Sequence, residues 1–221
     1  MKTLLQRLAV SRTALALTYA LSEALNRLAF LTPGSRRRRE KNKKALRGFS
    51  QKGFLNGQGT GALAALPFGR FSMDYNGCEV IASANVLRAL GQGRPLGETA
   101  AWYESHGIFL GGLWGTHVSA IPAYFRSLGL SPKTLYAARV RDSGAYDAAF
   151  SGARAAVFSF WNSAARLRDG IHTVALLHGG EGRLLICNLY SRDTAENSSF
   201  SSIADFVRRA GVLPILLVTL P

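Results

Sequence analysis

Cys78 stands where a cysteine can become a nucleophile. It follows the turn-forming run Asp74-Tyr75-Asn76-Gly77 and precedes EVIASANVLRAL (79–90), whose apolar pattern predicts a helix that ends at Gly91. At the start of a helix, free backbone N–H groups and the positive end of the helix dipole favour a thiolate. The alternative is a small apolar side chain that packs at a helix start.

A base for this thiol lies in the predicted hairpin IHTVALLHGGEGRLLICNLY (171–190). If Gly179, Gly180 and Glu181 form a three-residue turn, His172 faces Asn188. Directly opposed residues hold their Cβ atoms about 4.5–5.5 Å apart, so the Asn188 amide can orient the imidazole and leave its other nitrogen for the thiol. A four-residue turn would break this pairing.

The order of nucleophile, histidine and asparagine resembles that of papain-like cysteine peptidases. The stretches MDYNGCEVIASANVLRALG (73–91), GLWGTHVSAIPAYFRSLGL (112–130) and HTVALLHGGEGRLLICN (172–188) are similar to the family that includes the bacterial double-glycine leader peptidases. The resemblance covers about residues 68–221. It implies a papain-like fold and peptide-bond hydrolysis through a Cys78 thioester, with His172 as base and then acid and Asn188 as its orienting residue.

The chain departs from this family pattern around the nucleophile. Papain-like enzymes usually place a glutamine about six residues before the cysteine to complete the oxyanion hole, and Ser72 stands there instead. Asn76, together with the backbone N–H of Cys78, is our candidate for that role. Glu79 follows the cysteine directly, and an inward-pointing carboxylate there would oppose a thiolate.

The predicted elements place helices before strands. Helices are expected over 79–90, 97–106 and 118–128, and then strands over 134–139, 155–161, 172–178, 183–190 and 212–220, with helices at 145–150 and 202–210. Such segregation predicts an α+β architecture in which a helical part precedes an antiparallel sheet.

The N-terminal segment carries most of the positive charge. Residues 1–70 hold 14 basic and 2 acidic side chains, whereas residues 71–221 hold 13 and 11. Leucines at helical spacing predict an amphipathic helix over 3–31, a basic run follows at 36–52, and the Gly-rich stretch 53–69 has the composition of a linker. We therefore expect an N-terminal extension over 1–66 and a catalytic domain over 67–221.

Partners and compartment follow from this division. A peptide or protein is the expected substrate, and residues 36–52 are candidates for contact with an anionic membrane or nucleic acid. Two cysteines are too few for a disulfide framework or a zinc site, and no cofactor or metal is expected. We expect a cytoplasmic protein, with membrane association and secretion through residues 1–22 as open alternatives.

Three alternative activities remain open at this stage. The same residues would serve an acyltransferase or a deamidase, and the missing glutamine is also consistent with a non-catalytic binding protein. The sequence leaves the oligomeric state undetermined.

Overall fold

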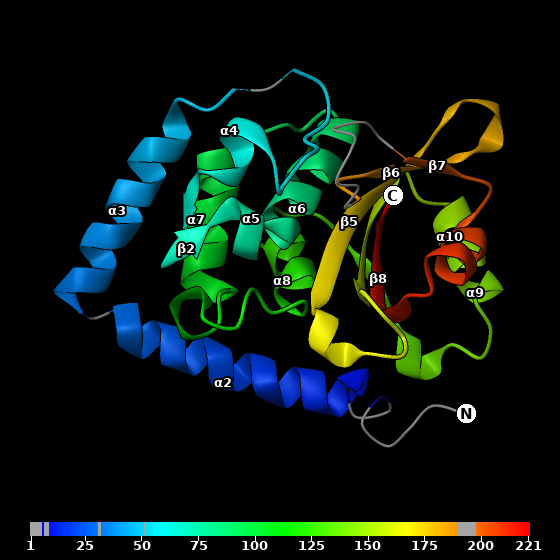
Figure 1. Cartoon of the computed structure of the whole chain (residues 1–221), viewed down its shortest axis with the longest axis horizontal. Helices are drawn as coiled ribbons and strands as arrows, with labels where there is room; N and C mark the ends of the chain where they lie inside the picture. Colours follow the sequence, from blue (N-terminus) through cyan, green and yellow to red (C-terminus); the bar gives the residue numbers. More distant parts are fainter. Residues whose placement is uncertain (1–5, 7–8, 31, 51, 190–197) are drawn as a thin grey trace.

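The computed structural model describes the chain except for residues 1–5, 7–8, 31, 51 and 190–197. At its centre lies a six-stranded antiparallel sheet in the order β3-β8-β4-β5-β6-β7 (Figure 1). The strands are β3 (Lys133–Tyr136), β4 (Ala155–Trp161), β5 (Ile171–His178), β6 (Leu184–Cys187), β7 (Ser198–Phe200) and β8 (Leu213–Leu220). The fold is therefore a mixed helix-and-sheet architecture with an antiparallel sheet, as expected.

Helices cover both faces of this sheet (Figure 1). One face meets the helices that precede the sheet: α5 (Met73–Asn76), α6 (Cys78–Ala89), α7 (Leu96–His106) and α8 (Ala120–Ser127). The other face meets α9 (Gly144–Ser151) and α10 (Ile203–Ala210), where Phe158 packs its ring on Tyr146 and on Phe206. Because side chains alternate along a strand, each strand residue belongs to one of these two layers.

Helix α6 is the central helix of the first layer. Ten of its twelve residues are buried, and it packs on β4 and β5. Small and apolar residues occur around its whole circumference, and its buried polar side chains Glu79 and Asn85 are hydrogen bonded, as expected for a helix enclosed by other elements. The start of this helix, with Cys78, is consequently held in the interior of the molecule.

The N-terminal helices differ from the expected pattern. The helix expected over 3–31 is α2 (Arg12–Phe30), and the basic run forms a second helix, α3 (Pro33–Arg47). Thr32 is the N-cap of α3, since its side chain accepts a hydrogen bond from the Ser35 N–H, and Pro33 occupies the first helical turn. These start signals are present in the sequence, but we expected no helix over the basic run at 36–52.

The Gly-rich stretch predicted as a linker belongs to the core. Leu55 and Leu63 are buried, and the Asn85 side chain holds the Leu55 backbone through two hydrogen bonds. Asn42 of α3 donates to the Glu104 carboxylate, and Leu46 is buried. The expected boundary between residues 66 and 67 therefore falls within one continuous packing unit.

The expected elements downstream of Phe71 are found with small shifts of their ends. The strand expected at 134–139 ends at Tyr136 and continues as a 3-10 turn, and the strand expected at 183–190 is β6, which ends at Cys187. Tyr190 lies outside the described residues. β7, the two-residue strands β1 (Pro67–Phe68) and β2 (Phe71–Ser72), and α4 (Gly61–Ala64) were not expected, because segments this short carry little periodicity.

Within the described part of the chain, the helices are too short or too polar to cross a bilayer.

The packing of α3 predicts that it contributes to global stability. Leu46→Ala should lower the free energy of unfolding by about 3 kcal/mol, because a fully buried leucine is lost and a cavity remains. Urea unfolding followed by circular dichroism measures this value, with exposed Lys44→Ala as the matched control. A loss below about 1 kcal/mol for Leu46→Ala would show that α3 is a dispensable appendage.

Candidate functional site

A cavity of about 540 Å³ opens at the start of α6. Its walls come from α5 and the first turn of α6, from the loop that follows α7, and from the ends of β4 and β5. Among the residues that line it are Asn76, Cys78, Glu79, Trp114, Trp161 and Ile171. The cavity thus brings the predicted nucleophile together with segments far apart in the sequence.

Cys78 lies at this cavity, but its thiol is not activated as the sequence indicated. Its side chain is 7% exposed, and Sγ donates a hydrogen bond to Oε2 of Glu79 at 3.1 Å. Burial, followed by the neighbouring Glu79 carboxylate, raises the pKa of Cys78 well above its ordinary value. The expected lowering by the helix terminus is therefore outweighed by desolvation and by a negative neighbour.

Glu79 is the second titratable group of the cavity. Only 2% of it is exposed, and its Oε1 accepts a hydrogen bond from Thr173 Oγ1 at 3.2 Å, while Thr173 in turn pairs with Ser159 at 2.9 Å. Burial raises the pKa of Glu79 to about 7. The carboxyl group therefore exchanges its proton near neutral pH, which is the range in which a general acid or base works best.

His172 does not meet Cys78, contrary to the prediction. Ile171 lines the Cys78 cavity and Thr173 contacts Glu79. Because neighbouring side chains on a strand alternate between its two faces, the His172 side chain lies on the opposite face of β5. There the imidazole packs edge-on against Phe160, at 5.9 Å between ring centres, and lines a separate cavity of about 350 Å³ beside α10. Burial lowers the pKa of His172 to about 4, so the ring is neutral at pH 7.

Asn188 holds His172 through its backbone rather than through its amide. The hairpin register pairs Ala175 with Cys187 and His178 with Leu184, which is shifted by two residues from the expected register. The turn has three residues, as expected, but it is displaced by one position: the Gly179 N–H donates to the Arg183 carbonyl oxygen, and residues 180–182 lie between them. His172 Nε2 consequently donates to the Asn188 carbonyl oxygen at 2.7 Å.

The Asn188 amide has a different partner. Its Oδ1 accepts from the backbone N–H of Gln58 at 3.1 Å, and its Nδ2 donates to Gln58 Oε1 at 2.9 Å. Asn188 therefore fastens the segment before α4 to the edge of the sheet. Its φ of 65° lies in the left-handed region, where asparagine is among the best tolerated residues.

Asn76 places a buried side-chain amide at the cavity. It ends α5, lines the cavity beside Cys78, and is 1% exposed. Among the residues that the structure describes, none hydrogen bonds to its amide nitrogen or its amide oxygen. A buried amide without a protein partner loses free energy of about 1–3 kcal/mol, so this side chain is suited to a ligand.

Trp161 supplies a second such donor, which the sequence analysis did not single out. It ends β4, lines the same cavity, and its indole Nε1 is buried with no acceptor within the described part of the chain. An indole N–H only donates, and Asn76 Nδ2 is a second buried donor of the cavity that has no partner among the described residues. The cavity can therefore bind a ligand oxygen through neutral hydrogen-bond donors.

Two of the functional residues had weak signals in the sequence. The sequence indicated Glu79 only as an obstacle to a thiolate, because neighbouring helix residues point about 100° apart and adjacency alone does not place two side chains in one cavity. Trp161 follows a strand of buried residues, but a tryptophan at the end of a strand is most often a packing residue. Only the tertiary structure reveals that its N–H is buried and unpartnered.

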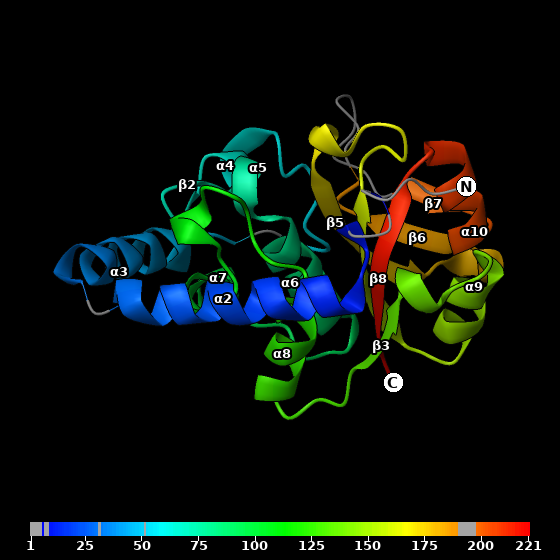
Figure 2. The same ribbon diagram turned by 90° about the horizontal axis from the view of Figure 1, so that it is seen from below.

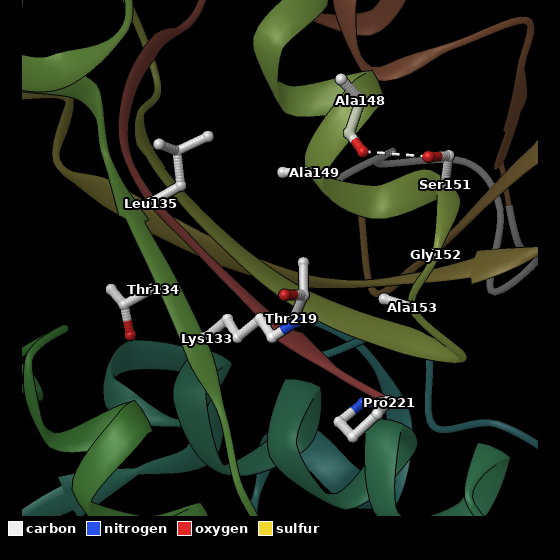
Figure 3. A pocket seen from close by; sticks show the side chains of 10 residues that line it. All are labelled: Lys133, Thr134, Leu135, Ala148, Ala149, Ser151, Gly152, Ala153, Thr219 and Pro221. Carbon is white, nitrogen blue, oxygen red and sulfur yellow. Dashed lines mark hydrogen bonds between the residues drawn. The ribbon is translucent and has the colours of Figure 1, made fainter.

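A further groove lies on the far side of the sheet, between β3, α9 and the end of β8 (Figure 3). Lys133 is the one charged side chain among the residues that line it, and the others are small or apolar apart from Thr134, Ser151 and Thr219. Its lining contains no cysteine, histidine or acidic side chain. Within the described residues, no cluster of histidine, cysteine and acidic side chains is suited to hold a metal ion.

No protein-family model matches the chain, and no curated protein matches it.

The raised pKa of Glu79 predicts a pH-dependent stability difference. In the unfolded chain Glu79 ionises near its ordinary value, whereas in the folded protein it stays protonated up to about pH 7. Its contribution to stability is therefore complete below about pH 4.5 and is lost as the pH rises towards 7. The neutral variant Glu79→Gln should gain about 3 kcal/mol relative to the wild type over this interval.

Denaturant unfolding at several pH values measures this difference. His172 changes the free energy of unfolding in the opposite direction, because its pKa is lowered and its contribution to stability is lost as the pH falls. This contribution is the same in the variant and in the wild type, so it cancels in their difference. The exposed control Glu98→Gln should show no such trend. A constant difference between Glu79→Gln and the wild type would mean that Glu79 is ionised at all these pH values.

Proposed function

We propose that this chain is a cysteine-dependent hydrolase of peptide bonds, in which Cys78 is the nucleophile and Glu79 takes the proton-transfer role first expected of His172. The observation that carries the proposal is the contact of 3.1 Å between Cys78 Sγ and Glu79 Oε2, inside a cavity with two unpartnered N–H donors. The resemblance of residues 68–221 to papain-like peptidases supports the reaction class and a papain-like fold.

Each group has a defined task in this reaction. Cys78 Sγ attacks the carbonyl carbon of the scissile bond while its proton passes to Glu79 Oε2. The carbonyl oxygen becomes an oxyanion, which accepts hydrogen bonds from Asn76 Nδ2 and Trp161 Nε1. Glu79 then gives the proton to the leaving amine as the C–N bond breaks, and a thioester remains on Cys78.

The second half of the reaction reverses the roles. Water attacks the thioester carbonyl and transfers a proton to Glu79, the C–S bond breaks, and the Cys78 thiolate recovers the proton. A pKa of about 7 lets Glu79 serve as acceptor and donor in turn at neutral pH. An amine in place of water would make the same site an acyltransferase, and a glutamine side chain in place of the peptide bond would make it a deamidase.

A non-catalytic binding protein is the second candidate. Two observations favour it: the pKa of Cys78 is raised, and His172 lies on the opposite face of the sheet. In that case the cavity binds a carbonyl-containing ligand through Asn76 and Trp161 without forming a covalent bond. Two results together would establish this candidate. The wild type shows neither turnover nor an acyl-enzyme, and Cys78→Ala still binds the ligand.

The catalytic assignment predicts a pattern of activities. Cleavage of a pool of synthetic peptides, followed by mass spectrometry, should be abolished by Cys78→Ala and by Glu79→Gln. It should persist in Cys187→Ala, because burial raises the pKa of that second thiol to about 12 and its strand lies outside the cavity. His172→Gln should retain turnover. Loss of activity in His172→Gln with an unchanged thermal midpoint would restore His172 as the base.

The oxyanion role of Asn76 predicts a specific kinetic effect. Asn76→Ala should lower kcat by about 100-fold to 1,000-fold, because one donor to the transition-state oxygen is lost. Its stability should change little or rise, since an unpartnered buried amide is removed. Steady-state kinetics and thermal unfolding of this variant measure the two effects. An unchanged kcat would show that Asn76 does not contact the reacting oxygen.

A further inference from the structure

Helix α2 is turned with its polar side inward. Ser22 and Asn26 are buried, and both side chains donate hydrogen bonds to the backbone oxygen of Ile108. Thr18 Oγ1 lies 2.8 Å from Nε2 of His117, whose ring also packs on Tyr19. These polar contacts fix α2 along the loop that follows α7, so its orientation on the body of the protein is defined.

The outward side of α2 is apolar. Leu17, Leu21 and Leu28 are 67%, 56% and 65% exposed, and we call them the leucine face. At 100° per residue they lie within about 40° of one another, with Ala24 among them, and opposite the buried Asn26. A surface helix of a globular protein normally has the reverse arrangement, because exposed leucines gain nothing from water.

The neighbouring loop extends this apolar surface. Leu110, Leu113 and Trp114 are exposed, and the hydrogen bonds from α2 to Ile108 place their loop beside the helix. Figure 2 shows α2 across the front of the molecule with this loop next to it. Trp114 also lines the Cys78 cavity, so the apolar surface reaches the mouth of the candidate site. Exposed apolar side chains on neighbouring segments are typical of an interaction site.

Helix α3 adds positive charge at the end of this surface. Its fifteen residues contain eight basic side chains and one acidic side chain, a net charge of +7. Arg37, Lys41 and Lys44 are exposed and share one side, opposite the buried Asn42 and Leu46. Figure 1 shows that α3 starts close to the end of α2 and turns away from it along the side of the molecule.

We propose that the leucine face, the 110–114 loop and the basic side of α3 together dock the protein on a bilayer that contains anionic lipids. An apolar helix face enters the boundary between head groups and acyl chains, and adjacent Lys and Arg side chains attract anionic head groups. The helix lies on the membrane surface rather than across it.

Charge favours this partner over two others. A second copy of the chain would bring together two proteins of net charge +14, each with its α3 near the contact, and this repulsion opposes a dimer through α2. Nucleic acid would attract α3, but phosphate contacts leave the leucine face in water. Of these three partners, the anionic bilayer is the one that contacts both the basic side chains of α3 and the leucine face.

Co-sedimentation of the full chain with vesicles tests the proposal. Binding should be strong to vesicles in which about a third of the lipid is phosphatidylserine and weak to phosphatidylcholine alone. Arg37→Gln, Lys41→Gln and Lys44→Gln together should weaken binding about 100-fold, since each charge contributes about fivefold. Leu17→Ser, Leu21→Ser and Leu28→Ser together should weaken it about tenfold or more.

Matched variants make the result specific. Arg139→Gln, Arg141→Gln and Arg154→Gln remove the same charge from exposed positions elsewhere and should leave binding within about fivefold of the wild type. Circular dichroism should show each variant folded. Three results would each overturn the proposal. The first is a wild type that does not bind vesicles, and the second is a leucine variant that binds as well as the wild type. The third is a wild-type dimer that does not bind vesicles and that the leucine substitutions convert to a monomer.

Discussion

The hydrogen bond between the Glu79 carboxyl group and the Thr173 hydroxyl group of β5, which itself pairs with Ser159 of β4, joins the helical layer to the sheet. A carboxyl group enclosed between a helix and a sheet is costly unless its oxygens are hydrogen bonded, and Thr173 together with Cys78 occupies both oxygens. This requirement directs Thr173 towards α6. It also holds the Cys78 thiol against the carboxyl group, so the protonation states of the two groups depend on one another.

The same contact decides the place of His172. Since neighbouring residues on a strand point to opposite faces, a Thr173 that faces α6 requires a His172 that faces α10. There the imidazole packs edge-on against Phe160 and donates to the carbonyl oxygen of Asn188. The Asn188 amide in turn joins the Gln58 segment to the sheet. Residues whose order matches a catalytic pattern thus form a structural network in this chain.

Each of the two N-terminal helices packs on the body of the protein through one side and exposes the other side to solvent. Polar side chains attach α2 to the loop after α7, and Asn42 and Leu46 attach α3 to α7, which leaves leucines and basic side chains on the outside. The attached loop also forms one wall of the Cys78 cavity through Trp114. The candidate site and the outer surface of α2 are therefore connected by a single short segment of the chain.

Local sequence determined the elements around the site. Apolar periodicity and Gly, Pro and Asn signals predicted the helix at Cys78, the strands at 155–161 and 213–220, and the mixed architecture with an antiparallel sheet. These signals act within a few residues, so the sequence alone reveals them. Asn76 beside Cys78 was likewise accessible, since a turn and the following helix hold the two residues close together.

The tertiary structure decided which side chains share a cavity. The hairpin register depends on the geometry of one turn, and the face on which His172 lies depends on the pairing of Thr173 with Glu79, a residue 94 positions away. The role of the Gly-rich stretch depended on its contacts with Asn85, and the outward direction of the leucines depended on hydrogen bonds to Ile108. Periodicity identifies the apolar side of a helix or strand, but only long-range packing determines whether that side meets the core or the solvent.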